Sequence, residues 1–176
     1  MSVGLPSKSV AIMGLAHAAD AVSPALVVAA KQLGASLGSM GTLVYMAADD
    51  RLLRYVAEGG APASLRLIAF SPAGNVTEHV ETYRYDTTWV DGVVCTGSAG
   101  AGYVRTMLHS VAFVIMVGDC ERVIERFDAL PSGATLIMLT DADPTEVHRM
   151  LETHSTTIKR LVVAASLPLA LKQLAQ

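Results

Sequence analysis

The chain is poor in charged and in aromatic side chains. Charged residues make up 16% of its 176 positions and aromatic residues 5%, whereas hydrophobic residues reach 52%. Soluble domains carry about 25% charged residues on average. Intrinsically disordered chains combine few aliphatic residues with a high net charge. A hydrophobic chain with a formal net charge of −3 falls outside that class, so we expect a folded domain with an aliphatic core.

Clusters of basic residues and long apolar runs are also lacking. Lys and Arg together number 13 against 16 Asp and Glu, which disfavours a nucleic-acid partner. A membrane-spanning helix needs about 18 consecutive apolar residues. The most apolar stretches, Val111–Val117 and Leu161–Leu171, are shorter or are interrupted by Ser166 and Pro168. We therefore expect no membrane partner either.

Cysteine is scarce, with two residues in the whole chain. Cys95 and Cys120 form neither a C-x-x-C pair nor a metal-binding spacing. We expect two reduced thiols with structural roles inside a cytoplasmic protein.

The N-terminal residues imitate a signal peptide. Lys8 precedes the apolar run Val10–Ala16, which ends in small residues. We favour the alternative, a first buried strand over Ser9–Met13 that ends at a Gly14 turn, because it completes a pattern that continues along the chain.

Short aliphatic runs recur from one end of the sequence to the other. Most are continuous rather than alternating with polar residues, which is typical of parallel strands covered on both faces. The expected strands are Val10–Met13, Thr42–Ala47, Leu65–Phe70, Val93–Thr96, Phe113–Val117, Ala134–Thr140 and Arg160–Ala164.

Helix signals lie between these runs. Ser23-Pro24 supplies an N-cap and a proline at the first helical position, and Asp143–Glu146 forms a capping box. Gly59-Gly60 ends another helix, and Leu167–Leu174 forms the last one. The alternation predicts an α/β fold: a doubly wound, mostly parallel, Rossmann-like sheet of about seven strands with helices on both faces. We expect a single domain over residues 1–176.

The segment Asn75–Asp91 departs from the pattern. Its mixed polar and aromatic character predicts a loop or a short extra strand. Tyr83, Tyr85 and Trp89 offer rings that could stack on a base. We prefer packing over the sheet edge or at a subunit contact.

A glycine-rich loop marks the candidate site. Open α/β sheets bind ligands outside the carboxyl ends of their strands, near the point where strand order reverses. Gly97–Gly102 follows an expected strand, and Arg105 lies in the helix after it. Glycines let the backbone approach a phosphate, and a helix N-terminus favours anions. The spacing G-x-x-G-x-G matches neither the dinucleotide motif nor a P-loop, so a flexible turn with close helix–sheet packing stays an open alternative.

Six segments carry a resemblance along nearly the whole chain. They are Val10–Gly14, Gly41–Tyr45, Glu58–Gly60, Leu67–Pro72, Val104-Arg105 and Phe113–Gly118. In their order and spacing the chain resembles the LOG-like (lysine decarboxylase-like) branch of the SLOG nucleotide-binding superfamily. The resemblance implies a Rossmann-like fold and a nucleotide-like ligand. In active relatives an arginine and a glutamate serve hydrolysis of the N-glycosidic bond of nucleoside monophosphates, and the matching positions here are Arg105 and Glu125.

Two departures from that family affect its phosphate site. After Tyr45 the family has a run of glycines, whereas this chain has Met46–Asp49. At the family's P-G-G-x-G-T-x-x-E signature, the chain keeps only the first glycine, Gly118, and the final Glu125. Asp119 puts a carboxylate where backbone N–H groups should face an anion, which is repulsive at short range. The resemblance therefore implies hydrolase activity that is weak or lost.

Other candidate centres have simpler explanations. His148 and Glu152 are one helical turn apart, a spacing that suits a metal ion, but no third ligand is near in sequence and an exposed helix face is preferred. Ser98, His109 and Asp119 lack the G-x-S-x-G context of a hydrolase nucleophile. We expect neither a metal nor a cofactor. The expected ligand-binding residues are Gly14, His17, Thr96, Gly97, Ser98, Gly100, Arg105, Gly118 and Asp119.

The expected function is binding of a nucleotide or nucleotide-like small molecule. Two alternatives stay open. One is a non-catalytic scaffold or assembly subunit that uses the fold for oligomer or partner contacts. The other is an active phosphoribohydrolase, in which Arg105 orients the substrate and Glu125 assists the leaving base or the ribosyl centre. Because low charge leaves little polar surface to coat a monomer, we expect a homo-oligomer, a dimer or larger.

Overall fold

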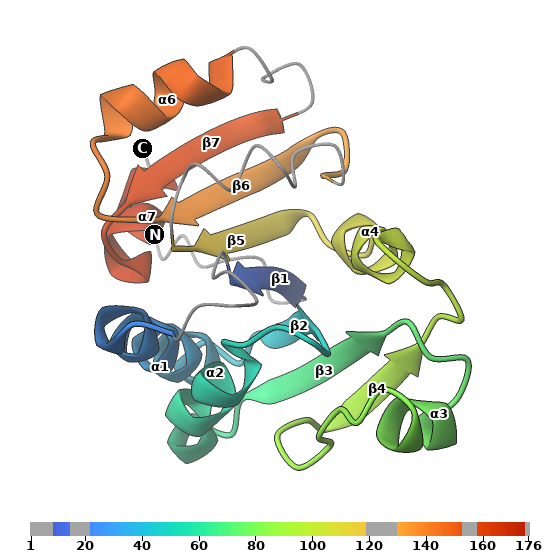
Figure 1. Cartoon of the computed structure of the whole chain (residues 1–176). Coiled ribbons are helices and arrows are strands. Elements are labelled where there is room, and N and C mark those ends of the chain that lie inside the picture. Colours follow the sequence, from blue (N-terminus) through green and yellow to red (C-terminus); the bar gives the residue numbers. More distant parts are fainter. Residues whose placement is uncertain (1–8, 15–21, 119–129, 153–157, 175–176) are drawn as a thin grey trace.

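The computed structural model describes residues 9–14, 22–118, 130–152 and 158–174 (Figure 1). His17, Cys120 and the candidate residues Asp119 and Glu125 lie outside the described residues. Over the described ranges the chain alternates between strands and helices, as the sequence predicts.

Seven strands of the described chain form one sheet in the order β4-β3-β2-β1-β5-β6-β7. Every neighbouring pair is parallel. The strands are β1 (Ser9–Gly14), β2 (Leu43–Ala47), β3 (Arg66–Ser71), β4 (Gly92–Cys95), β5 (Phe113–Val117), β6 (Ala134–Leu139) and β7 (Ile158–Ala164). The chain runs outward from β1 to β4 and then returns to β5 on the other side of β1. The order therefore reverses between β1 and β5, where Gly14 lies opposite Val117.

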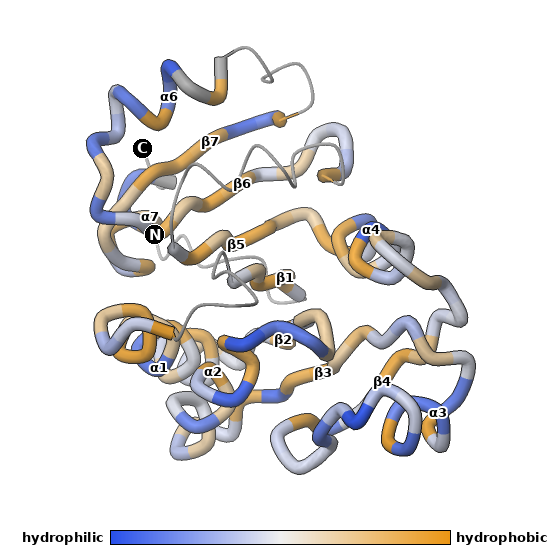
Figure 2. Tube along the Cα trace, viewed as in Figure 1, coloured by the Kyte–Doolittle hydropathy of each residue, from blue (hydrophilic) through white to orange (hydrophobic). Residues whose placement is uncertain are grey.

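The predicted strands and the doubly wound fold class are confirmed. Each strand lies within two residues of its expected bounds, and β5 has the expected bounds Phe113–Val117. The continuous aliphatic runs arise because both faces of the sheet are covered. Ile115 and Met116 of β5 point to opposite faces, and both are fully buried. In Figure 2 β5 accordingly runs orange along most of its length.

Helices cover both faces of the sheet (Figure 1). On one face lie α1 (Pro24–Ser39), α2 (Leu53–Gly60) and α7 (Leu167–Leu174). On the other face lie α4 (Gly102–His109) and α6 (Pro144–Glu152). Among the described helices, none combines the length and the apolar character needed to cross a bilayer.

The predicted starts of α1 and α6, the predicted end of α2 at Gly59-Gly60 and the predicted bounds of α7 are confirmed. Ser23 Oγ accepts the Leu26 N–H at 3.2 Å and caps α1. Asp143 Oδ1 accepts the Thr145 N–H at 2.7 Å at the start of α6. Side-chain oxygens thus satisfy N–H groups that have no partner inside the helix.

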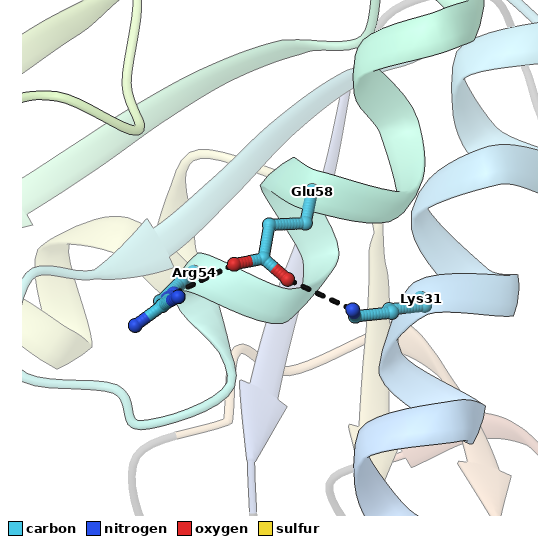
Figure 3. Close-up of polar contacts among 3 residues, drawn as sticks. All are labelled: Lys31, Arg54 and Glu58. Atoms are coloured by element: carbon cyan, nitrogen blue, oxygen red, sulfur yellow. Dashed lines mark hydrogen bonds and ion pairs between the residues drawn. The ribbon is translucent and has the colours of Figure 1, made fainter.

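Glycines bring α1 and α2 into close contact. A Cβ added at Gly34 would lie 2.0 Å from the Val56 carbonyl oxygen, and one added at Gly59 would lie 2.0 Å from the Lys31 carbonyl oxygen. Only residues without a side chain permit this approach. Beside the contact, Glu58 accepts from Lys31 at 2.9 Å and from Arg54 at 2.6 Å (Figure 3). These hydrogen bonds, that of Lys31 first, lower the pKa of Glu58.

The segment Asn75–Asp91 differs from its prediction as a loop or extra strand. It contains the short helix α3 (Val76–Glu81). Asn75 Oδ1 accepts the Glu78 N–H at 2.9 Å, and Glu78 Oε2 accepts the Gly74 N–H at 2.7 Å, so the turn is held from both sides. The hydrophobic periodicity of the sequence does not indicate this helix, because its two valines are exposed whereas the polar His79 is fully buried.

Candidate functional site

The carboxyl ends of the strands bring the candidate loops to one edge of the sheet. Gly14 ends β1 and lies beside Val117 of β5, so Gly14 and Gly118 meet at the switch point. Ser71 of β3 pairs with Cys95 of β4, which places the loops after these two strands side by side. The expected site residues therefore fall into two groups, one at β1 and β5 and one after β4.

The distance between the two groups follows from the strand order. Strands β3 and β2 lie between β4 and β1, so at about 4.8 Å per strand the groups start about 14 Å apart. Helix α4, which connects β4 to β5, packs against β3 and β2 and therefore occupies part of the space between the two groups. A single extended ligand is needed to contact both groups.

Hydrogen bonds tie the loop after β4 to the end of β3. The Thr96 hydroxyl donates to the Ser71 carbonyl at 2.9 Å and accepts the Ser98 N–H at 3.2 Å. The Gly97 N–H donates to the Ala73 carbonyl at 2.9 Å. The Thr96 side chain, which we predict from the sequence to contact a ligand, therefore stabilises the turn through its own hydrogen bonds.

Left-handed backbone explains two glycines of this loop. Gly97 and Gly100 both have φ near +64°, a conformation that residues with side chains rarely adopt. No heavy atom of the described structure lies within 4 Å of a Cβ added at Gly100. Backbone geometry, rather than tight packing, thus requires glycine at position 100.

Helix α4 begins without a side-chain cap. Its N-cap residue is Ala101, and α2 likewise begins without a side-chain cap, at Leu52, whereas Ser23, Asn75 and Asp143 cap α1, α3 and α6. Arg105 lies in the second turn of α4 and is exposed, and within the described ranges no carboxylate forms an ion pair with it. The start of α4 thus combines a partial positive charge, backbone N–H groups and a nearby guanidinium, a combination that suits an anion.

Asp50, which the sequence reasoning missed, lies at the switch point. The Gly14 N–H donates to Asp50 Oδ2 at 2.7 Å, and the Leu52 N–H donates to Asp50 Oδ1 at 2.8 Å. The second bond closes a local turn, which an aspartate two residues before a buried leucine can indicate in the sequence. The first bond joins two segments far apart in sequence, and no local pattern indicates it.

Two backbone N–H groups of the loop after β2 donate to carbonyl groups of the protein itself. The Ala48 N–H donates to the Phe70 carbonyl at 2.8 Å, and the Asp50 N–H donates to the Ala47 carbonyl at 3.0 Å. Met46, at the first position where the resembled family has glycine, is fully buried in the core. These N–H groups are therefore turned toward the protein and not toward a phosphate.

The aromatic residues of 82–91 pack on the protein itself. Tyr83 stacks on Tyr85 with ring centroids 5.5 Å apart, and Tyr85 meets His79 edge-on at 5.4 Å. Trp89 lies 5.3 Å from the Arg54 guanidinium and packs against the core under α1 and α2. Burial raises the pKa of Tyr85, and the charge of Asp49 adds to the effect.

Neither a metal centre nor a hydrolase triad assembles in the part of the chain that the structure describes. No group of three His, Cys, Asp or Glu residues there could hold a metal ion. His148 is exposed, and its Nδ1 lies 2.7 Å from the Pro144 carbonyl oxygen of its own helix. Ser98 precedes α4 whereas His109 ends it, so the two are separated by the length of the helix, about 10 Å.

Solved structures with the same fold were found, whereas no protein-family model and no curated protein sequence matches the chain. The molybdenum cofactor binding protein of the phototrophic bacterium Rippkaea orientalis matches with a TM-score of 0.65 at 17% identity, over 98% of this chain and 97% of that one. The molybdenum cofactor carrier protein of Chlamydomonas reinhardtii matches with a TM-score of 0.65 at 17% identity, over 96% of each chain.

A structural-genomics protein, TM1055, matches with a TM-score of 0.69 at 16% identity, over 96% of this chain and 99% of that one. These neighbours share the overall fold of this chain, so the Rossmann-like fold that the sequence resemblance implies is confirmed. At such low identity the likeness establishes the fold alone.

Proposed function

We propose that this chain binds a small anionic molecule of nucleotide-like chemistry at the carboxyl edge of its sheet, with hydrolase activity weak or lost. The observation that carries the proposal is the start of α4, where a loop with two left-handed glycines leads into a helix without a side-chain cap. The nearby exposed Arg105 supplies a positive charge. Neighbours of the same fold and length include proteins described as binding or carrying the molybdenum cofactor, a small molecule.

The strength of this anion site is modest. A helix N-terminus contributes about 1 kcal/mol to the binding of an anion. A charge-assisted hydrogen bond from Arg105 adds about 1.5–3 kcal/mol. Together these terms correspond to a dissociation constant in the millimolar range or weaker. A biologically useful affinity therefore requires the uncharged part of the ligand to contact the edge as well.

The loop after β2 supports the proposal of weak or lost hydrolysis. A phosphoribohydrolase must hold the substrate phosphate firmly while the base leaves, but the N–H groups of Ala48 and Asp50 donate to the protein's own carbonyls. Glycine substitutions in this loop would leave both N–H groups occupied unless these internal hydrogen bonds broke. We therefore favour binding without efficient turnover.

Thermal unfolding with a panel of nucleoside mono-, di- and triphosphates tests the binding function. A ligand at 100 times its dissociation constant stabilises the fold by about 2.7 kcal/mol. The Arg105→Ala variant should lose most of this stabilisation. Arg66→Ala is the matched control, since Arg66 is an exposed arginine at the amino end of β3, on the opposite edge of the sheet. No stabilisation of the wild-type protein by any ligand of the panel would contradict the proposal.

Release of free base from AMP or CMP tests the alternative of an active phosphoribohydrolase. We expect no more release from the wild-type protein than from the Arg105→Ala variant. Release by the wild-type protein well above that of the variant would favour the enzyme.

A scaffold role is the second candidate, and exposed valines favour it. Val76 and Val80 of α3 are 56% and 46% exposed, and Val94 of the edge strand β4 is 39% exposed. Helix α3 packs beside β4, so the three side chains lie at one end of the sheet. Light scattering of the wild-type protein and of a Val76→Lys variant tests this role: a monomeric wild-type protein would contradict self-association.

A further inference from the structure

Helix α3 has a single buried side chain, that of His79. The helix lies beside the edge strand β4 (Figure 1). Val76 and Val80 are largely exposed, whereas His79 is fully buried. A short helix is usually attached to a protein by an apolar side chain, because tertiary packing and not helix propensity stabilises it. The attachment of α3 depends instead on an imidazole, a group whose charge changes near neutral pH.

The His79 ring is buried without a polar partner. Neither Nδ1 nor Nε2 has a hydrogen-bond partner among the described residues. The ring meets that of Tyr85 edge-on, with centroids 5.4 Å apart, and Tyr85 in turn stacks on Tyr83. A neutral imidazole leaves one N–H unpaired in such a place, whereas an imidazolium leaves two and buries a charge as well. The attached form of α3 therefore resists protonation of His79.

The charges around His79 do not compensate an imidazolium. Within the described ranges no carboxylate forms an ion pair with it, and Glu78 Oε2 accepts the Gly74 N–H at 2.7 Å. Burial, and after it the charge of Asp49, raises the pKa of Tyr85, whereas burial alone lowers the pKa of His79. A cation–π contact with Tyr85 offsets only part of the cost of a buried charge. The other titratable or charged side chains on α3, on the turn after it and on β4 are Glu81, Tyr83, Arg84, Asp86 and Cys95.

The turn after α3 is strained and is tied to the same helix. Arg84 is exposed and has a φ of +57°, a left-handed conformation that is unfavourable for a residue with a side chain. The Tyr83 N–H donates to the Glu78 carbonyl at 3.2 Å, and the Tyr85 N–H donates to the His79 carbonyl at 3.2 Å. The turn therefore depends on the position of α3, and its strain favours opening.

We infer that His79 is a pH-sensitive anchor: its protonation detaches α3 and the turn Thr82–Asp86 while the sheet stays folded. Detachment brings the imidazolium and its two N–H groups into water, so each opening event takes up a proton at acidic pH. The equilibrium constant for opening should rise about tenfold for each pH unit below about 6.5, the pKa of a solvated histidine, until the pH reaches the lower pKa of the attached form. This inference goes beyond the proposed ligand site and does not rest on it.

Amide hydrogen exchange of the wild-type protein, resolved by residue in NMR spectra, tests the anchor. Rates at about pH 7.5 and about pH 5.5 are corrected for the intrinsic pH dependence of exchange and expressed as protection factors. Those of Tyr83 and Tyr85 should fall by up to about tenfold at the lower pH. Those of Val114 and Ile115, which are fully buried in β5, should stay unchanged.

Two variants separate the proton from the strain. In His79→Phe the protection of the two tyrosine amides should be the same at both pH values. His109→Phe, at an exposed histidine that ends α4, should keep the wild-type response. Arg84→Gly relieves the left-handed strain, so it should raise the protection of Tyr85 at both pH values and keep the ratio between them.

Three results would overturn the inference. The first is equal protection of Tyr83 and Tyr85 at both pH values in the wild-type protein. The second is a fall of the same size in His79→Phe, and the third is a parallel fall at Ile115, which would indicate global unfolding. If His79→Phe does not fold, NMR titration of the wild-type histidine rings replaces it. The His79 ring should then titrate at a lower pH than that of the exposed His109, and an equal or higher midpoint would contradict the anchor.

Discussion

The Thr96 hydroxyl donates a hydrogen bond of 2.9 Å to the carbonyl oxygen of Ser71, and so joins the carboxyl ends of β3 and β4. The same hydroxyl accepts the Ser98 N–H, and the Gly97 N–H reaches the Ala73 carbonyl. One side chain thus positions the glycine loop that precedes α4. The candidate anion site depends on this brace, although Thr96 itself has no spare donor for a ligand.

Replacement of Thr96 by valine tests the brace. Valine has nearly the same shape but leaves the Ser98 N–H without its acceptor, so we expect a loss of about 1–3 kcal/mol in the free energy of unfolding and weaker ligand binding. Urea denaturation and calorimetry measure the two effects. Thr106→Val is the matched control, because the Thr106 hydroxyl donates to the Gly102 carbonyl one turn before it in α4 and does not brace a loop. Equal effects of the two substitutions would argue against a special role for Thr96.

Gly34→Ala tests the close contact of α1 and α2. Alanine gains about 1 kcal/mol of helix propensity over glycine. The added Cβ would nevertheless lie 2.0 Å from the Val56 carbonyl oxygen, and overpacking of this kind costs about 1–3 kcal/mol or more. The overlap is with backbone, so we expect net destabilisation in urea unfolding. Gly92→Ala, where the nearest atom is the mobile Ile68 Cδ1 at 3.2 Å, should be better tolerated. A stabilised Gly34→Ala protein would show that the helices separate freely.

His79 predicts a pH dependence of stability. It is fully buried, neither ring nitrogen has a hydrogen-bond partner among the described residues, and burial lowers its pKa. Below the unfolded-state pKa of about 6.5, the unfolded chain binds a proton that the folded chain resists. The free energy of unfolding should therefore fall as the pH drops through about 6.5, and this penalty is absent at higher pH.

His79→Phe keeps a ring against Tyr85 and removes the titration. Urea unfolding at about pH 7.5 and about pH 5.5 should show a smaller pH-dependent loss in this variant than in the wild-type protein. The same exchange at His109, an exposed residue at the end of α4, should leave the wild-type pH dependence in place. Identical losses in the wild-type protein and in His79→Phe would refute the role of His79.

The ion pairs of Glu58 predict a small, salt-sensitive contribution. Lys31 and Arg54 lower the pKa of Glu58, so the stabilisation is present above the unfolded-state pKa of this carboxyl and is lost as the pH falls. Glu58→Gln should lower the thermal midpoint at low salt. The difference from wild type should shrink at about 1 M NaCl, where the Debye length is about 3 Å. Glu81→Gln, at an exposed carboxylate of α3, serves as control, and a salt-independent difference would point to packing instead.

The strands could be predicted because their signal is local. A run such as Phe113–Val117 is apolar at every position, and only burial on both faces accommodates it. Helix α3 could not be predicted from periodicity, because it exposes Val80 and buries His79. The local signal for this helix is its capping residue, Asn75, whose side chain accepts the Glu78 N–H.

The candidate site was predictable only in part. The glycines at positions 97 and 100 indicate left-handed backbone, and both residues have a positive φ in the structure. The role of Asp50 depends on its contact with Gly14, which is 36 positions away, and such a contact follows from the fold and not from local sequence. Thr96 is polar and close to the loop, but its hydroxyl faces the Ser71 carbonyl, a direction that the sequence does not specify.

Titration of the isotope-labelled protein with AMP, followed by the backbone amide signals in NMR spectra, tests the central claim most directly. The account predicts saturable shifts of Gly97, Gly100 and Gly102 at the start of α4. It also predicts unchanged signals of Gly41 and Gly133, which have positive φ at the opposite edge of the sheet, just before β2 and β6. Shifts of similar size at both edges, or no saturable shift of the loop glycines, would contradict a ligand site at the start of α4.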